Sequence, residues 1–325
     1  MDPKLTTQKY LSASRVKTLE TCSWIYWCKY HLNLPDKSND GALRGTICHS
    51  VFEILVKKRH KKHFTLMMTN GLIKSSPAID RLVIKLLKKS EIYTEENYKM
   101  IDEMILVGLK NDFFGGKGGR IDKPEQEFNI ENESPEYKIR GFIDKPILYD
   151  KKKTVKIVDY KSSKYKFRGD DLKSNLQAMM YSLASKKIWP GYKPIIEFLF
   201  LRHPKQPLQQ LEFTDEQIGG FERYLEHVNG IVNGFSEKDS NSNFAFSDKK
   251  NKWMCGVGSW VCPFKNSFEY YSLVEDGKVI KSSFKNDLEV SSENQKIEKK
   301  TYSGCPKFVR STGSSSNDDA FSDLN

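Results

Sequence analysis

The sequence predicts a mixed α/β protein, in which an N-terminal helical part precedes a mixed sheet flanked by helices. Three observations predict this class. Apolar residues recur at the helical period through much of residues 12–110. Strand-like segments then follow between residues 125 and 160, and a further apolar run occupies residues 194–201. A helical segment over residues 171–186 separates these strands, which gives the order β-β-β-α-β.

The helical part begins at Ser12 or Ser14, because either side chain can cap a helix that extends to about residue 30. A polar loop follows. Apolar spacing then predicts a helix over residues 43–55 and two more helical stretches over residues 76–110. In the second of these regions one stripe of apolar side chains is expected, formed by Ile79, Leu82, Val83, Leu86 and Leu87.

The chain changes character after the glycines of residues 115–119. This cluster lacks the spacing of a phosphate-binding P-loop, so we interpret it as a mobile loop. Strands are expected at residues 125–130, 137–148, 154–160 and 194–201. Thr214 and Gln217 form a capping-box pattern, which predicts a helix from there to about residue 232.

The C-terminal part is less regular. Residues 236–254 are polar, and residues 255–305 show only weak periodicity. The last fifteen residues carry three aspartates and no basic residue, a composition typical of disorder. We therefore expect an N-terminal helical region over 1–120, a core over 121–235, a cysteine-containing extension over 236–310 and a disordered tail over 311–325.

Composition narrows the functional classes. The 325 residues carry a net charge of +11, and 38% of them are hydrophobic, which is enough for a packed core. No apolar run approaches the roughly 20 residues of a membrane helix, and no signal-peptide pattern is seen at the start. We expect a soluble, intracellular and cytoplasmic protein without membrane association. The positive charge favours a polyanionic partner such as nucleic acid, although a lysine-rich composition alone can also produce it.

Two short segments, at two neighbouring predicted strands, contain the candidate catalytic side chains. Because side chains alternate along a strand, Asp159 and Lys161 project to the same side. A charged pair after a buried strand suits a metal ligand beside a group that orients or deprotonates water. Asp144, on the preceding strand, can reach the same place. Taken alone, each feature has a simpler explanation, namely a surface ion pair or a turn before Pro146.

A third segment adds a histidine. His49 lies four residues after Gly45 on the helix predicted over residues 43–55. Alone, it would more often be an ordinary helix histidine than a ligand. Two carboxylates favour Mg²⁺ or Mn²⁺, which prefer oxygen ligands, and a histidine in the set shifts the preference toward Mn²⁺.

The ordered motifs resemble a known family. G-x-x-x-H ending at His49, G-x-x-D ending at Asp144, D-x-K-S beginning at Asp159, and Q-x-x-x-Y from Gln177 to Tyr181 are similar to the RecB-type branch of the PD-(D/E)xK nucleases, which includes CRISPR-associated Fe–S exonucleases. The opening Ser12-Ala-Ser-Arg-Val with Cys22 and Tyr26 fits that branch too, although Ser23 stands where the family often has proline. The resemblance covers residues 10–265.

The resemblance implies a role for each matching residue. The metal ligands would be His49, Asp144, Asp159 and the carbonyl of Tyr160. Lys161 would position or activate the attacking water and stabilise charge on the scissile phosphate. Gln177 and Tyr181 would order the site and touch DNA, although core packing is an equal alternative for Tyr181. Supporting candidates are Glu53 and either Glu125 or Glu127.

The resemblance also implies a restriction-endonuclease-like core and a metal-dependent DNA nuclease. Phosphodiester hydrolysis as an exonuclease or a single-strand-directed enzyme is the leading expectation. The alternatives are a nicking or structure-specific endonuclease and a DNA-binding module that does not cleave. No helicase motif is present, so a helicase or recombination partner would be a separate chain. DNA recombination, repair and viral DNA processing are compatible settings.

The six cysteines form a separate question. Without a secretory signal, disulfides are not expected. The resemblance implies a [4Fe–4S] cluster with one early and three late ligands, here Cys22, Cys255, Cys262 and Cys305. The late cysteines are more widely spaced than in the family, so a zinc site and the absence of any metal remain alternatives. Cys28 and Cys48 are expected to be structural.

The basic residues are concentrated in one segment. Residues 151–168 contain eight Lys or Arg and one acidic residue, Asp159. This segment includes the proposed catalytic strand, and Lys164, Lys166 and Arg168 follow that strand directly. We therefore expect these three residues to contact DNA phosphates. No recognition-helix or zinc-finger pattern is present, and little sequence specificity is expected.

Overall fold

The computed structural model describes residues 10–36, 38–256 and 261–308, and it divides the chain into two compact units. The described residues of Met1–Lys17 and Ser38–Gly234 form the first unit, and those of Thr18–Lys37 and Phe235–Asn325 form the second. The predicted disordered tail, 311–325, lies outside the described residues. No helix among the described residues is long and apolar enough to cross a membrane.

A five-stranded mixed sheet forms the centre of the first unit, as the sequence predicted. Its strand order is β1-β4-β5-β6-β7. The strands are β1 (Arg120–Ile121), β4 (Lys145–Tyr149), β5 (Thr154–Lys161), β6 (Lys193–Phe200) and β7 (Leu208–Leu211). Strands β5 and β6 are parallel and the other pairs are antiparallel. The carboxyl ends of β5 and β6 therefore lie at one edge, where Lys161 is in register with Phe200.

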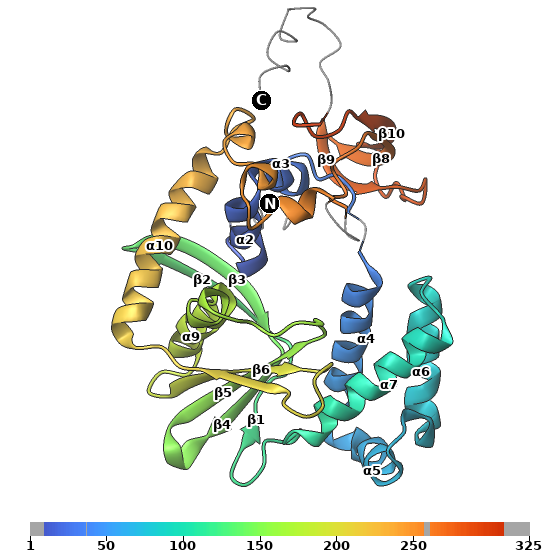
Figure 1. Ribbon diagram of the computed structural model, residues 1–325, viewed down its shortest axis with the longest axis vertical. Helices are drawn as coiled ribbons and strands as arrows, with labels where there is room; N and C mark the ends of the chain where they lie inside the picture. The colour runs from blue at the N-terminus through green and yellow to red at the C-terminus, as the bar shows by residue number, and fades with distance from the viewer. Residues whose placement is uncertain (1–9, 37, 257–260, 309–325) are drawn as a thin grey trace, which may run out of the picture. The chain divides into compact units, whose positions relative to one another are not determined.

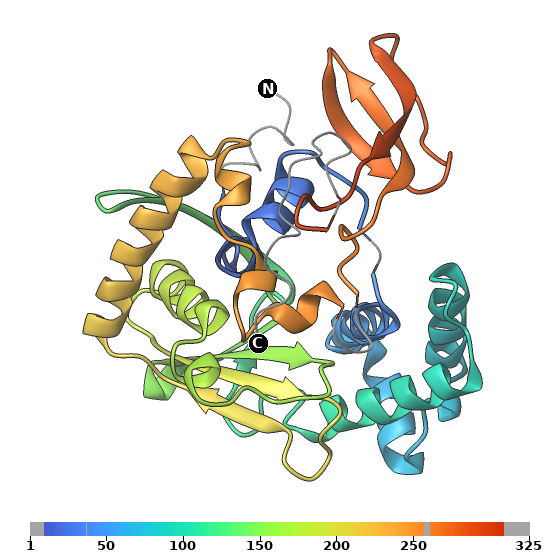
Figure 2. The ribbon, with the colours of Figure 1, turned by 45° about the horizontal axis from the view of Figure 1, so that its top comes forward.

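Helices α4 (Asp40–Leu55), α5 (Lys61–Asn70), α6 (Pro77–Lys89) and α7 (Glu95–Lys110) gather beside one another, as Figure 1 shows. Their apolar side chains form one core with Val158 and Tyr160 of β5 and with Leu199 of β6. The predicted stripe of α6 faces this core: Ile79, Val83 and Leu87 are buried, and its other members are partly buried. The apolar period in the sequence thus predicted α4, α6 and α7, which lie together in both views (Figure 1 and Figure 2), whereas α5 was not predicted.

Helix α9 (Leu176–Ile188) provides the crossover that parallel strands β5 and β6 require, and it contacts β6. The single helix predicted over residues 171–186 is wrong in one respect, because α8 (Asp170–Lys173) is separate from α9. Asn175 explains the break: its side chain accepts a hydrogen bond from the amide of Ala178 at 3.0 Å and caps α9.

Helix α10 (Asp215–Gly234) begins at the predicted capping box, which is confirmed. The amide of Thr214 donates to the side chain of Gln217 at 2.9 Å, and the amide of Gln217 donates to the hydroxyl of Thr214 at 3.3 Å. Short 3₁₀ turns complete the helical content: η1 (Lys58–His60), η2 (Ile73–Ser75), η3 (Asp150–Lys152), η4 (Asp239–Asn241), η5 (Ala245–Ser247) and η6 (Lys252–Cys255).

The strand predicted over residues 137–148 is instead two strands in two sheets. Strand β3 (Glu136–Ile143) pairs with β2 (Gln126–Glu133) and forms an isolated bridge from Ile139 to Leu11, whereas β4 pairs with β5. Asp144 lies at the point where the chain passes from one sheet to the other. The apolar pattern continues through both strands, so the sequence alone could not reveal the change.

Gly141 permits close packing across the β2–β3 ladder. It lies opposite Phe128, and a Cβ at position 141 would come within 2.5 Å of that ring. We expect Gly141→Ala to lower the free energy of unfolding by about 1–3 kcal/mol, because overpacking forces the ring or the strand to move. Urea denaturation measures this change.

A matched glycine provides the control for that substitution. Gly219 lies in α10, where an added Cβ would meet no heavy atom within 4 Å. Gly219→Ala is expected to raise stability by up to about 1 kcal/mol through helix propensity. Equal effects at the two positions would mean that the contact with Phe128 does not matter.

The second unit combines an early helix with a late sheet. Helix α2 (Ala13–Thr21) ends before Cys22, whose extended backbone (φ −162°, ψ 111°) starts α3 (Ser23–Tyr30), so the predicted single helix to residue 30 is broken there. The sheet has the order β10-β8-β9, with β8 (Phe268–Glu275), β9 (Lys278–Ser283) and β10 (Gln295–Tyr302) all antiparallel. The weak periodicity of residues 255–305 did not predict these strands.

Candidate active site

Strand β5 places Asp159 and Lys161 side by side at its carboxyl end. Asp159 is buried, and Lys161 Nζ lies 2.7 Å from its Oδ2 atom. The same ammonium donates a hydrogen bond to Gln177 Oε1 at 2.5 Å. The alternation of the strand thus produces the pairing that the sequence predicted, and Gln177 of α9 holds the lysine from the other side.

Helix α9 also fixes the carboxylate. Gln177 Nε2 and Tyr181 Oη each donate a hydrogen bond to Asp159 Oδ1 at 2.9 Å. Burial, followed by the charge of Asp159, raises the pKa of Tyr181 well above its ordinary value, so its hydroxyl keeps its proton and remains a donor. Tyr181 is only 4% exposed, which favours an ordering role over contact with DNA.

A second group of donors lies near Asp159, beside the carboxyl end of β5. The structure brings His49, Glu125 and Asp144 together, with their nearest donor atoms all within 4.8 Å of one another. His49 Nδ1 lies 3.4 Å from Asp144 Oδ2 and 3.8 Å from Glu125 Oε1. His49 Nε2 lies 3.0 Å from the carbonyl oxygen of Tyr160, and the amide of Tyr160 donates to Asp144 Oδ2 at 2.9 Å.

The electrostatics of this group are those of a cation site. Burial and then the charge of Asp159 raise the pKa of Asp144 to about 7. Burial by itself would lower the pKa of His49, but the hydrogen bond to Glu125 and the charges of Asp144 and Asp159 raise it to about 9. Carboxylates crowded in this way need a proton or a cation between them, and a divalent ion fits that need.

A close contact that depends on Gly45 positions His49. Gly45 precedes it by one helical turn, and a Cβ at position 45 would lie 2.6 Å from Ser162 Oγ, just beyond β5. The absence of a side chain therefore lets α4 approach the end of the strand. This gives the G-x-x-x-H spacing a physical reason, because the approach brings His49 to the carbonyl of Tyr160.

The structure distinguishes among the supporting glutamates. Glu125 joins His49 and Asp144, whereas Glu127 pairs with Arg140 at 2.9 Å and Glu53 pairs with Lys57 at 3.1 Å. Glu125 has a φ of +49°, a left-handed conformation that costs a non-glycine residue roughly 1–3 kcal/mol. Such strain is typical of functional positions, and only the fold reveals it.

Lys145 is a feature that the sequence analysis missed. It follows Asp144 directly, it is 2% exposed, and its ammonium donates to the carbonyl of Phe113 at 3.2 Å. Burial lowers its pKa to about 7. No local pattern distinguishes this lysine from an exposed one, because its burial results from the helices that cover β4.

The three predicted DNA-binding cations follow β5. Lys164, Lys166 and Arg168 lie in the segment between β5 and α8, and the carbonyl of Lys164 lies 2.9 Å from His203 Nε2. The ammonium of Lys166 lies 5.9 Å from the ring of Phe200. These residues are thus near the carboxyl ends of β5 and β6, where open α/β sheets bind their ligands.

Four cysteines converge in the second unit. Burial raises the pKa of Cys262 to about 12, and the neighbouring Cys22, Cys255 and Cys305 raise it too. These are the four residues that the resemblance assigned to a cluster. Among the described residues, no three of the cysteine sulfurs lie within 4.8 Å of one another.

Of the other two cysteines, Cys28 packs in one apolar cluster with Cys22 and Cys262, whereas Cys48 does not. Cys28 is buried in the same unit and its thiol donates a hydrogen bond to Tyr302 Oη at 3.6 Å. Cys48 is buried in the core of the first unit, between α4 and its neighbours. A structural role for both thiols stays a prediction.

Tyr181→Phe tests the ordering role. The change removes one of the two hydrogen bonds to Asp159 Oδ1 and leaves that of Gln177. We expect the rate of nuclease cleavage, the activity that the resemblance implies, to fall about 10- to 100-fold, as is usual for a residue that orients a metal-site carboxylate. Turnover is measured as a function of Mn²⁺ concentration.

The control for this substitution is Tyr192→Phe. Tyr192 donates a hydrogen bond to Asp150 at 2.6 Å on the surface. Its loss should leave cleavage within about twofold of wild type, in line with ordinary surface substitutions. Equal rates for the two variants would exclude an ordering role for Tyr181.

A mixed sheet with Asp144, Asp159 and Lys161 at adjoining strand ends is the architecture of a nuclease. The model of the PD-(D/E)XK nuclease superfamily matches residues 10–267, and the chain belongs to this superfamily. No curated protein matches the chain. The crystal structure of a candidate exonuclease from Eubacterium rectale is similar, with 13% sequence identity and a TM-score of 0.46, over 77% of this chain and 90% of that one.

Proposed function

We propose that the protein is a divalent-metal-dependent deoxyribonuclease that acts as an exonuclease or on single strands. The observation that supports this most directly is the proximity of two sets of groups at the carboxyl end of β5. One set, His49, Glu125 and Asp144, fits a cation, and the other, Asp159 with Lys161, lies beside it. A phosphodiester bond needs both charge neutralisation and a positioned nucleophile, and this arrangement supplies residues for each.

The donor chemistry fits Mg²⁺ or Mn²⁺. The ligands would be His49, Asp144, Asp159 and the Tyr160 carbonyl, with Glu125 added from the geometry. Asp159 Oδ2 touches the ammonium of Lys161 but accepts no well-aligned hydrogen bond, so it keeps a lone pair for a cation. Such an ion, when bound, would act as a Lewis acid toward the phosphate and lower the pKa of water.

The remaining steps belong to side chains of this chain. Lys161 Nζ holds the nucleophilic water by a hydrogen bond and stabilises the negative charge that develops on the phosphate. Gln177 keeps the ammonium in place, since it binds both Lys161 and Asp159. Tyr181 holds Asp159 by a hydrogen bond to Oδ1, which leaves Oδ2 available to a cation.

The four converging cysteines are proposed to bind a [4Fe–4S] cluster. A tetrahedral zinc ion with Zn–S bonds of about 2.3 Å would hold its sulfurs about 3.8 Å apart. Among the described residues, no three cysteine sulfurs lie within 4.8 Å of one another, a spacing that fits a cluster in which each cysteine binds its own iron better than this zinc geometry. The cluster would stabilise the second unit, in which its ligands come from both ends of the chain.

A cleavage assay tests the proposed function. End-labelled linear DNA and circular single-stranded DNA are incubated with Mg²⁺, with Mn²⁺ or with a chelator. We expect metal-dependent degradation of linear DNA and no cut in the circle. Cleavage of the circle would favour the endonuclease alternative, and DNA binding without any cleavage would favour a binding module. We also propose that the protein acts in DNA recombination, DNA repair or viral DNA processing.

A further inference from the structure

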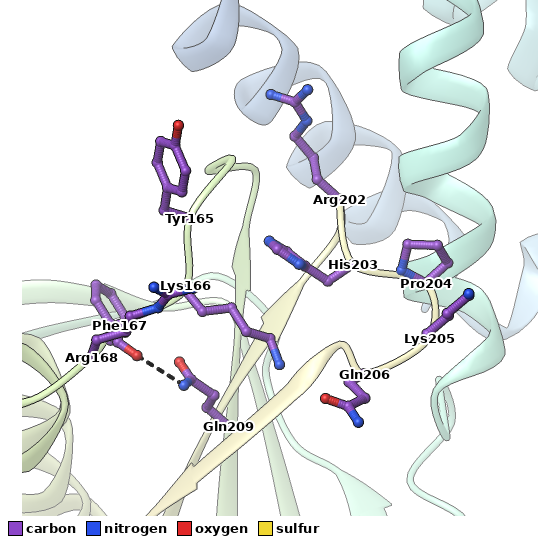
Figure 3. Close-up of a pocket in the computed structure, with 10 residues that line it drawn as sticks. All are labelled: Tyr165, Lys166, Phe167, Arg168, Arg202, His203, Pro204, Lys205, Gln206 and Gln209. Atoms are coloured by element: carbon purple, nitrogen blue, oxygen red, sulfur yellow. Dashed lines mark hydrogen bonds between the residues drawn. The ribbon is translucent and has the colours of Figure 1, made fainter.

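A basic pocket lies at the carboxyl ends of β5 and β6, outside the catalytic group. The segment between β5 and α8 forms one wall, and the β6–β7 hairpin forms the other. The volume is about 620 Å³, within the range of small-molecule sites. Figure 3 shows side chains from both walls around one space. The sequence analysis assigned nothing to the hairpin wall.

The lysine and arginine side chains that line the pocket make it positively charged. Lys166 and Arg168 come from the first wall, and Arg202 and Lys205 come from the hairpin, while no carboxylate lines the space. Within the described part of the chain, none of these four cations has a carboxylate within 4.0 Å, although exposed lysines elsewhere in the same unit, such as Lys193, are paired. Clustered cations without counter-charges repel one another, so their site favours an anion.

The two walls are held together without a ligand. His203 Nε2 on the hairpin lies 2.9 Å from the carbonyl of Lys164, and Gln209 Nε2 donates to the carbonyl of Phe167 at 3.0 Å. The ring of Phe167 packs edge-on against Phe198 of β6 at 4.9 Å. The pocket is therefore formed in advance, which lowers the entropic cost of binding.

One aromatic ring at the pocket is unusually exposed. Tyr165 is 71% exposed, the largest value among the exposed large hydrophobic side chains of the described residues. Its ring is near the ammonium of Lys164, with 5.6 Å to the centroid. An exposed ring beside unpaired cations is the combination with which proteins bind single-stranded nucleic acid, because a base stacks on the ring while cations hold the phosphates.

The pocket adjoins the catalytic strand. The amide of Leu201, where the hairpin begins, donates to the carbonyl of Lys161 at 2.9 Å. A strand whose scissile phosphate lies at Lys161 can therefore continue between the two walls. A space of about 620 Å³ suits the nucleotides of one chain rather than a duplex.

We propose that this pocket binds the nucleotides adjacent to the scissile phosphate of a single DNA strand, with Arg202 and Lys205 on the phosphates and Tyr165 stacked on a base. The inference rests on the proposed nuclease function and adds its substrate class. The hairpin thus selects an unpaired strand.

The test compares two double variants of the full chain. Arg202→Ala with Lys205→Ala removes two cations from the hairpin wall, and Lys151→Ala with Lys152→Ala removes two exposed lysines from η3, before β5. Fluorescence anisotropy measures the affinity for a labelled oligo-dT strand in a chelator at several salt concentrations. Thermal unfolding verifies that both variants are folded.

The hairpin variant is expected to bind the strand about 5- to 50-fold more weakly, with a salt slope lower by about 1.4, because two phosphate contacts are lost. The η3 variant should bind like wild type. Tyr165→Ala should weaken binding of the strand about 5- to 150-fold and leave duplex binding unchanged. Equal binding by the hairpin and η3 variants would overturn the proposal.

Two further measurements separate binding of a DNA strand from binding of free nucleotides, and binding from catalysis. If dTMP binding is lost in the hairpin variant while oligo-dT affinity is unchanged, the pocket binds free nucleotides, and the proposal is rejected. Hydrolysis of bis(p-nitrophenyl) phosphate with Mn²⁺, a substrate too small to extend from Lys161 into the pocket, tests the nuclease function on its own. The binding assay contains no metal. It therefore tests whether the pocket binds a single strand, independently of whether the protein cleaves DNA.

Discussion

Lys161→Ala is expected to lower the rate of DNA cleavage by about 10²- to 10⁴-fold, the range for loss of a group that transfers a proton or stabilises charge in the transition state. Lys161 is the ammonium nearest to Asp159, at 2.7 Å, and Gln177 fixes its direction. Alanine leaves no positive group at this position of β5. Cleavage is measured as single-turnover rates on end-labelled DNA with Mg²⁺ and with Mn²⁺.

DNA binding should remain nearly intact in Lys161→Ala, because most phosphate contacts are expected outside the catalytic group. The fold should also persist, since Asp159 keeps its hydrogen bonds from Gln177 and Tyr181. Asp159→Ala should abolish cleavage in the same way. Full activity of Lys161→Ala would remove the basis for the assigned site.

Lys193→Ala is a suitable control for this experiment. Lys193 starts β6, at the end of the parallel pair opposite to Lys161, and forms a surface ion pair with Glu212 at 2.6 Å. Exposed pairs contribute about 1 kcal/mol or less. This variant should cleave DNA at the rate of wild type, which separates the role of Lys161 from a general loss of positive charge.

Cys262→Ala is expected to release the iron of the proposed cluster and to destabilise the second unit. Cys262 is 8% exposed and lies among Cys22, Cys255 and Cys305, so its loss removes one ligand from the centre of the group. A protein purified without oxygen should be brown with about four irons per chain. The variant should be colourless, contain little iron and unfold at lower temperature.

Cys48→Ala is the matched control, because Cys48 is also buried but lies in the core of the first unit. It should keep the iron and the colour, and lose only a small packing contribution. Zinc in place of iron in the wild-type protein would favour the zinc alternative. Wild-type protein without either metal would mean that the thiols serve only as buried apolar groups.

The sequence by itself determined the features that depend on neighbours along the chain. The alternation of β5 placed Asp159 and Lys161 on one side, and the capping box of Thr214 and Gln217 began α10 where predicted. The apolar period of α6 identified its buried face. These are local properties, because each follows from backbone geometry over a few residues.

Only the tertiary structure decided the features that depend on distant parts of the chain. It selected Glu125 over Glu127 as the third donor beside His49 and Asp144, because β2 turns the latter glutamate toward Arg140. It also divided the predicted strand at Asp144 between two sheets. Strand pairing and burial cause both results, and residue type does not encode either one.

The distribution of positive charge was also determined partly by the sequence and partly by the tertiary structure. The sequence established a net charge of +11 and its concentration in residues 151–168. The fold added Arg202 and Lys205, which are more than thirty positions downstream, and placed them across a pocket from Lys166. Parallel strands end at the same edge of a sheet, so segments that are distant along the chain form one surface there, and sequence spacing cannot predict which residues meet.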